Sequence, residues 1–139
     1  MNEKKERVSV KLSRDSVLAI TAYKSLLFKM PPEDVPVSYS FIIEKAHNEI
    51  KDFYDQIDWS RINSKQTFIP GVSDNNDSLI QGLNTKLAFN TDEYNGLRSL
   101  QHIMQTNFFS GRVYLSFTIK SLLFAAILNQ HDTLKDYFI

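Results

Sequence analysis

Arg7-Val8-Ser9-Val10-Lys11-Leu12-Ser13 is the stretch of sequence on which the fold of this chain depends. Its apolar residues alternate with polar ones, which is the period of a strand that buries one face. Ser13 is a good helix N-cap, because its side-chain oxygen can accept a hydrogen bond from the first helical turn. A lone strand leaves backbone N–H and C=O groups unpaired. The segment therefore needs a second strand from elsewhere in the chain.

A second segment with the same alternation lies past the middle of the chain. Residues 84–89 repeat the alternating pattern, and Asn90 follows them as Ser13 follows the first segment. Glu93 stands three residues after Asn90, at the capping-box position. We therefore expect strand 7–12 to pair antiparallel with strand 84–89, and both apolar faces to be buried over helices.

Helical periodicity follows each of the two expected strands. Apolar residues recur at steps of three and four over about 14–29, and Pro31 ends this helix because proline has no N–H group. A second helix is expected over 38–57. In the second half, one helix should follow the strand directly. Beyond a loop at Gly111, a last helix is expected through 113–127.

The two halves of the sequence overlay almost without gaps. The strand and first helix match at a shift of 77 residues, which places Ser13 on Asn90. The second helix matches at a shift of 76 residues, which places Phe41 on Phe117. Such an internal repeat is a stronger signal than any single motif in this chain. It predicts a mainly α fold with a two-stranded antiparallel β-ribbon.

Residues 58–82 differ from both halves. They contain several turn-forming pairs and the polar run 73–78, with no sustained period. A loop of this length is unusual inside one compact domain. We therefore predict a first repeat over 1–57, a linker over 58–82 and a second repeat over 83–139.

The composition is that of an ordinary globular protein. The chain has 139 residues, a formal net charge of zero and no cysteine. It therefore has no disulfide or thiolate metal site, and a reducing compartment is expected. No run approaches the ~20 apolar residues of a membrane span, and the first residues lack the apolar core of a signal peptide. These features predict a cytoplasmic protein with no membrane partner.

The succession of strand, capping residue, helix, loop and helix resembles the ribbon–helix–helix DNA-binding family. The segments that carry this resemblance are 7–15 and 37–41 in the first half, with 86–92 and 113–117 in the second. Members of this family usually have one repeat and form homodimers. The chain resembles a tandem form, in which two ribbon–helix–helix repeats would make an intramolecular pseudo-dimer.

The resemblance implies that double-stranded DNA is the partner and that the ribbon lies in its major groove. A two-stranded ribbon fits that groove, and Arg, Lys and Asn side chains suit base edges. The implied base-reading residues are Arg7, Ser9, Lys11, Asn84, Lys86 and Ala88. Helix starts can bind phosphate through free N–H groups. The implied phosphate clamps are Ser38, Tyr39, Tyr114 and Leu115.

The implied function is sequence-specific DNA binding, as a transcriptional repressor or as a plasmid or phage accessory factor. In this family two copies often lie side by side on DNA, so self-association of pseudo-dimers is a further expectation. Two positions depart from the family pattern. Ala88 offers only a methyl group, and Tyr114 stands where a small capping residue is expected.

Other interpretations of the same residues are open at this point. Residues 7, 9 and 11 could be merely the solvated face of a strand, and Lys4 and Lys5 are expected to be a frayed basic tail. An antitoxin-like or adaptor module could instead hold a protein partner through the linker and the C-terminal tail 134–139, which ends in apolar residues.

The sequence contains no motif for catalysis or for a cofactor. Its three histidines are far apart and lack the spacing of metal ligands, and no P-loop or GxGxxG sequence is present. We therefore expect neither an enzyme nor a metal site. The charge is uneven, because residues 1–30 carry seven basic and three acidic residues and residues 31–62 carry the reverse. A basic leading segment can bind an anion locally despite zero net charge.

Overall fold

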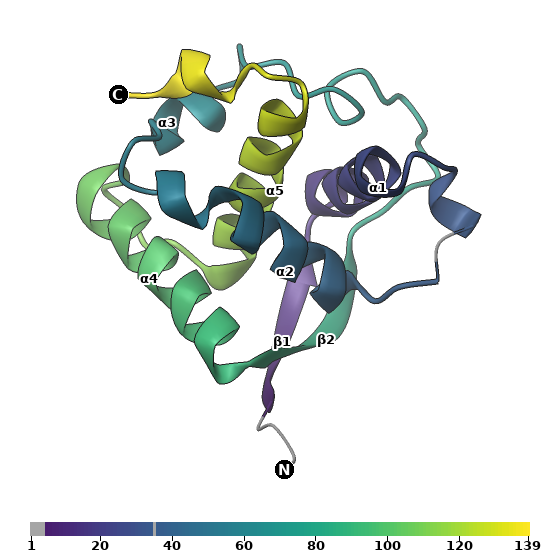
Figure 1. The fold of residues 1–139 in the computed structure, drawn as a ribbon, viewed down its shortest axis with the longest axis horizontal. Coiled ribbons are helices and arrows are strands. Elements are labelled where there is room, and N and C mark those ends of the chain that lie inside the picture. Colours follow the sequence, from purple (N-terminus) through teal and green to yellow (C-terminus); the bar gives the residue numbers. More distant parts are fainter. Residues whose placement is uncertain (1–4, 35) are drawn as a thin grey trace.

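A computed structural model describes residues 5–34 and 36–139 of the chain (Figure 1). Within these residues the fold is mainly helical with a two-stranded antiparallel sheet, as predicted, and it has five α-helices where four were expected. The strands are β1 (Lys5–Leu12) and β2 (Leu83–Asn90). The helices are α1 (Arg14–Phe28), α2 (Tyr39–Ile50), α3 (Trp59–Ile62), α4 (Thr91–Asn107) and α5 (Leu115–Gln130). None of them is both long and apolar enough to cross a membrane.

The two strands pair in the antiparallel sense that their alternation predicted, and each is longer than expected. Arg7 lies opposite Ala88, and Lys11 lies opposite Asn84. On the other face of the ribbon, Leu12, Leu87 and Phe89 are buried in the core, with Val8 and Val10 half-buried beside them. Burial of this face fixes the register, because a slip of one residue would turn it to solvent.

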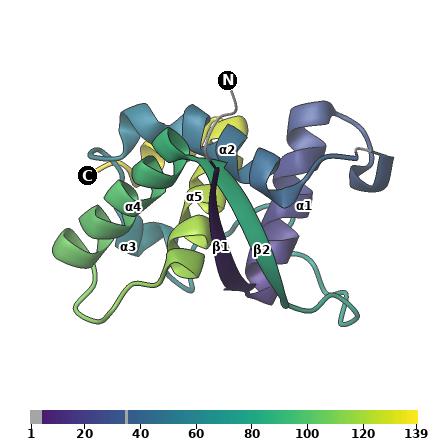
Figure 2. The same cartoon turned by 90° about the horizontal axis from the view of Figure 1, so that it is seen from below.

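Each strand leads directly into a helix through the predicted capping residue. The Ser13 hydroxyl accepts a hydrogen bond from the Ser16 N–H at 3.2 Å. The Asn90 side chain accepts one from the Glu93 N–H at 2.8 Å. Figure 2 shows the consequence, with α1 and α4 on opposite sides of the ribbon.

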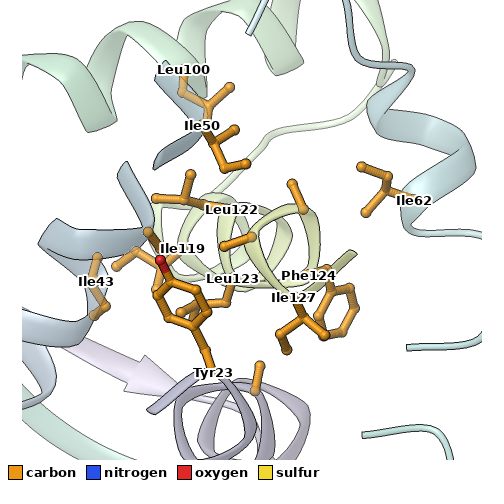
Figure 3. Packing of buried hydrophobic residues seen from close by; sticks show 14 of the residues in the cluster. Tyr23, Ile43, Ile50, Ile62, Leu100, Ile119, Leu122, Leu123, Phe124 and Ile127 are labelled. Carbon is orange, nitrogen blue, oxygen red and sulfur yellow. The ribbon is translucent and has the colours of Figure 1, made fainter. Parts of the chain in front are cut away.

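Helix α5 forms the centre of the core. It is mostly apolar around its circumference, and every residue from Ser121 to Leu128 is buried, as are Thr118 and Ile119. A helix with this pattern must be surrounded by other elements. Figure 3 shows α5 side chains packed among residues of the four other helices. The labelled partners are Tyr23 of α1, Ile43 and Ile50 of α2, Ile62 of α3 and Leu100 of α4.

The expected end of α2 near residue 57 is wrong, because the helix ends at Ile50. A 3-10 turn over Lys51–Phe53 follows, and Ile57 then forms an antiparallel bridge with Phe138. The buried Trp59 indole donates to the Tyr54 carbonyl at 3.1 Å. A helix continued to residue 57 would not allow the chain to turn back and make these contacts.

The segment 58–82 contributes to the same core as the helices. It begins with α3, and Trp59, Ile62, Ile69 and Val72 are buried. The Arg14 guanidinium at the start of α1 also donates to backbone carbonyl groups in this segment, at residues 75 and 77. These contacts bind the segment to α1 and α5.

The C-terminal tail packs on its own chain. Leu134 is buried at the start of the 3-10 turn Leu134–Tyr137. The Asp58 N–H donates to the Tyr137 carbonyl at 2.7 Å, and the Ile139 N–H donates to the Gln56 carbonyl at 2.7 Å. Ile139 itself remains 82% exposed.

One carboxylate joins three helices through hydrogen bonds. Glu49 of α2 accepts hydrogen bonds from the Tyr23 hydroxyl at 2.6 Å, the Asn129 amide at 2.7 Å and the Gln130 amide at 2.9 Å. Tyr23 belongs to α1, and the two amides belong to α5. Burial and the neighbouring carboxylate raise the pKa of Tyr23, so its hydroxyl keeps the proton that it donates.

A second polar contact lies between α2 and α4. His47 Nδ1 and Glu93 Oε2 are 2.7 Å apart and largely buried, so the Glu93 side chain does not complete the expected capping box. Gly96 lies against the His47 ring, and an added Cβ would be 2.2 Å from Nε2. Burial lowers the pKa of His47 from its ordinary 6.5 and raises the pKa of Glu93. A neutral imidazole avoids a buried charge at this contact, in which neither His47 Nδ1 nor Glu93 Oε2 has a well-aligned hydrogen bond.

The hydrogen-bonded group of Glu49, Tyr23, Asn129 and Gln130, called here the Glu49 cluster, generates a prediction for stability. Glu49→Ala should lower the free energy of unfolding by about 1–3 kcal/mol, because the buried Tyr23 hydroxyl loses its acceptor. Urea unfolding followed by circular dichroism measures the change. Glu33→Ala, at an exposed carboxylate in the 3-10 turn Pro32–Asp34, is the matched control. Equal midpoints for the two variants would contradict the assigned role.

The His47–Glu93 contact generates a prediction for pH. Below its ordinary pKa near 6.5, histidine in the unfolded chain gains a proton that folded His47 resists. The stability advantage of the wild type over His47→Gln should therefore shrink as the pH falls from about 7.5 to about 5.5. Unfolding curves at a series of pH values test this. An advantage that grew on acidification would instead indicate a charged imidazolium–carboxylate pair.

Candidate nucleic-acid interface

The outward face of the ribbon brings together all six residues that were predicted to read bases. In β1 the exposed residues are Arg7, Ser9 and Lys11. In β2, Asn84 and Lys86 are exposed and Ala88 is half-buried. The register places Ser9 opposite Lys86 at the centre of this face. The six side chains therefore form one continuous surface, and the core occupies the opposite face (Figure 2).

Lys5 belongs to the same surface, which corrects its assignment to a frayed tail. It is the first residue of β1, pairs with Asn90 and is exposed. The alternation of β1, extended backwards from Arg7, would have placed it there. Lys4 lies outside the described residues. With Lys5 and its partner Asn90 included, four of the eight residues on this face are cationic and none is acidic.

The start of α2 lies against the edge of the ribbon. The Ser38 hydroxyl caps the helix by accepting from the Phe41 N–H at 3.1 Å. Two residues further along, the Ser40 hydroxyl accepts from the Ala88 N–H of β2 at 3.0 Å. Helix formation gives no partner to the N–H groups of the first turn, and Tyr39 is the first residue of that turn. Such groups can bind a phosphate.

The start of α5 is built differently. Tyr114 is the N-cap residue, but its side chain makes no capping hydrogen bond and is 58% exposed. The Arg112 guanidinium carbon lies 4.9 Å from the centre of the Tyr114 ring. Leu115 is the first helical residue and is half-buried. The four predicted clamp residues thus lie at the starts of α2 and α5, and Arg112 adds a cation that we did not select from the sequence.

Comparisons with protein-family models, with curated proteins and with solved structures find no match to this chain. Within residues 5–34 and 36–139, no group of three or more His, Cys, Asp or Glu side chains could hold a metal ion.

The unequal helix starts generate a prediction. Ser38→Ala should lower the free energy of unfolding by about 1 kcal/mol, because the helix loses a capping acceptor. Tyr114→Ser should add about 1 kcal/mol from a new cap, less the ~0.5 kcal/mol lost with the Arg112 stacking contact. Thermal unfolding of both variants beside the wild type measures the two changes. If both variants changed the free energy of unfolding in the same direction, the contrast between a capped α2 start and an uncapped α5 start would be wrong.

Proposed function

We propose that the β1–β2 ribbon binds double-stranded DNA in the major groove and reads its sequence. The chain would act in the cytoplasm as a transcriptional repressor or as a plasmid or phage accessory factor. One observation carries the proposal. The six residues Arg7, Ser9, Lys11, Asn84, Lys86 and Ala88 share one outward face of a ribbon whose other face is anchored in the core.

The chemistry of this face suits base edges. Arg7, Lys11 and Lys86 supply the donors that guanine O6 and N7 accept, and Asn84 can donate to and accept from adenine. The Ser9 hydroxyl can donate or accept a hydrogen bond at a base edge. The Ala88 methyl group can contact the methyl group of thymine. A two-stranded ribbon is narrow enough for a groove about 12 Å wide.

The helix starts beside the ribbon support the same docking. The start of α2 is bound to β2 through Ser40 and Ala88, so its free N–H groups lie next to the readers. The start of α5 lies on the other side, where Arg112 adds positive charge. Groups at these places would contact the two DNA backbones and fix the register of the ribbon on the duplex.

We further infer that the chain is a tandem ribbon–helix–helix protein that folds as its own pseudo-dimer. The repeats would cover 1–57 and 83–139, joined by the segment 58–82. Two features support this. Each strand ends at a capping residue that starts a helix, and the helix starts at Tyr39 and Leu115 follow at matching distances along the sequence.

The charge balance suggests that affinity depends on specific contacts. The net charge is zero, so long-range attraction to DNA is weak and phosphate binding comes from local cations. The alternative of a protein partner held by the C-terminal tail has less support, because backbone hydrogen bonds to residues 56 and 58 hold that tail. Ile139 alone would be available to a partner as a large exposed apolar residue of the tail.

The ribbon proposal predicts the effect of removing single readers. Arg7→Ala and Lys11→Ala should each weaken binding to a duplex selected from a random pool by ~1–3 kcal/mol. Both side chains are exposed, so the melting temperature should barely change. Titration of labelled duplex measures the affinity. Lys135→Ala, an exposed lysine in the C-terminal turn, controls for the loss of one charge.

Two outcomes would count against the proposal. If selection from a random pool enriched no duplex, the proposal that the chain binds specific DNA would be wrong. If Arg7→Ala, Lys11→Ala and Lys135→Ala all bound the duplex equally strongly, DNA binding would stand. The assignment of Arg7 and Lys11 as base readers would be wrong.

A further inference from the structure

A small cavity lies on one flank of the ribbon, between β1 and the start of α5. Its volume is about 140 Å³, and its lining comes from Lys11, Ser13, Ser116, Phe117 and Lys120. Sites for drug-sized ligands measure about 300–1,000 Å³. This cavity, called here the lysine cavity, therefore has room for one small group. Two lysines and two serines are among its lining residues, and each of these side chains can donate hydrogen bonds.

Lys120 is the unusual member of this cavity. Its nitrogen lies 4.6 Å from the centre of the Phe117 ring and 5.7 Å from that of Phe124. In residues 5–34 and 36–139 no carboxylate lies within 4.0 Å of it. Partial burial disfavours the charged form and lowers the pKa of this lysine, although the Asp15 carboxylate acts in the opposite direction. An anion bound beside a partly buried cation is screened less by water, so it would gain more there than at a solvated lysine.

The opposite flank of the ribbon has no such arrangement. In the sequence overlay Lys120 matches Glu44, and Lys11 matches Ala88. The hydroxyl of Ser40, which matches Ser116, accepts a hydrogen bond from β2. The Ser116 hydroxyl makes no corresponding bond to β1 in the part of the chain that the structure describes. The open, doubly cationic cavity is therefore a property of the α5 flank.

We propose that the lysine cavity binds one phosphate group at Lys120, and that the DNA backbone supplies it, while Lys11 at the border of the cavity stays among the predicted base readers. This inference rests on the proposed function, since the ribbon must first place a duplex beside the cavity. Lys11 also borders the surface of predicted base readers, so the cavity lies where a backbone would leave the groove. The α5 flank would then bind the backbone more strongly than the α2 flank does. The duplex would be bound in a single orientation.

The test compares the salt dependence of DNA binding in the full chain. Lys120→Gln should weaken binding to the selected duplex about equally for all related sequences. It should also reduce the slope of log affinity against log salt concentration by about one, as expected for one lost phosphate contact. Lys120→Arg keeps the charge and should retain most of the slope. Lys135→Gln removes an exposed charge that is not among the lining residues of the cavity, and it should leave the salt slope unchanged.

A second measurement does not depend on the stability of the variant. Inorganic phosphate titrated into the labelled wild-type chain at low ionic strength should shift the amide signals of Ser13 and Ser116 in a saturable way. Sulfate, which has similar shape and charge, should compete. If the amide signals of Ser13 and Ser116 did not shift, the assignment of a phosphate site to this cavity would be wrong.

The outcomes separate this inference from the proposed function. A wild type that selects a duplex, with an unchanged salt slope in Lys120→Gln, would overturn the phosphate site and leave the ribbon proposal intact. A wild type that selects no duplex would overturn the proposed function. In that case saturable phosphate shifts would identify a site for free phosphate, and DNA as the source would be wrong.

Discussion

Pairing between β1 and β2 is the interaction on which the rest of the structure depends. In the described residues each strand has the other as its partner, and about seventy residues of chain separate them. Side chains alternate along a strand, so a slip of one residue would exchange the two faces of the ribbon. Leu87 and Phe89 would then face solvent, and the cations would face the core. Burial of one face thereby determines what the other face presents.

The helices convert this ribbon into a rigid platform. Capping by Ser13 and Asn90 makes the ends of the strands the starts of α1 and α4, with no flexible connection between them. Helix α5 then occupies the centre of the core, and the Glu49 cluster joins it to α1 and α2. The surface that would meet a ligand is therefore supported by regular elements, which place side chains more accurately than loops do.

Local patterns in the sequence predicted the strands, their pairing, the three polar caps and the shared face of the readers, because each follows from alternation or from residues three apart. The end of α2 could not be predicted in this way, since it depends on the bridge from Ile57 to Phe138. The contact of Glu93 with His47 and the cavity between Lys11 and Lys120 likewise join distant parts of the chain. The repeat arrangement and the DNA partner stay predictions.

The long separation of the strands also bears on how the molecule reaches its fold. Contacts between distant residues form slowly, because a large loop must close before they contribute. During synthesis β1 leaves the ribosome well before β2 exists, and its backbone edge has no partner until the second half follows. An unpaired edge can accept a strand from a neighbouring chain. A topology with such distant strands therefore favours exchange of β2 between two newly made molecules as its route to misassembly.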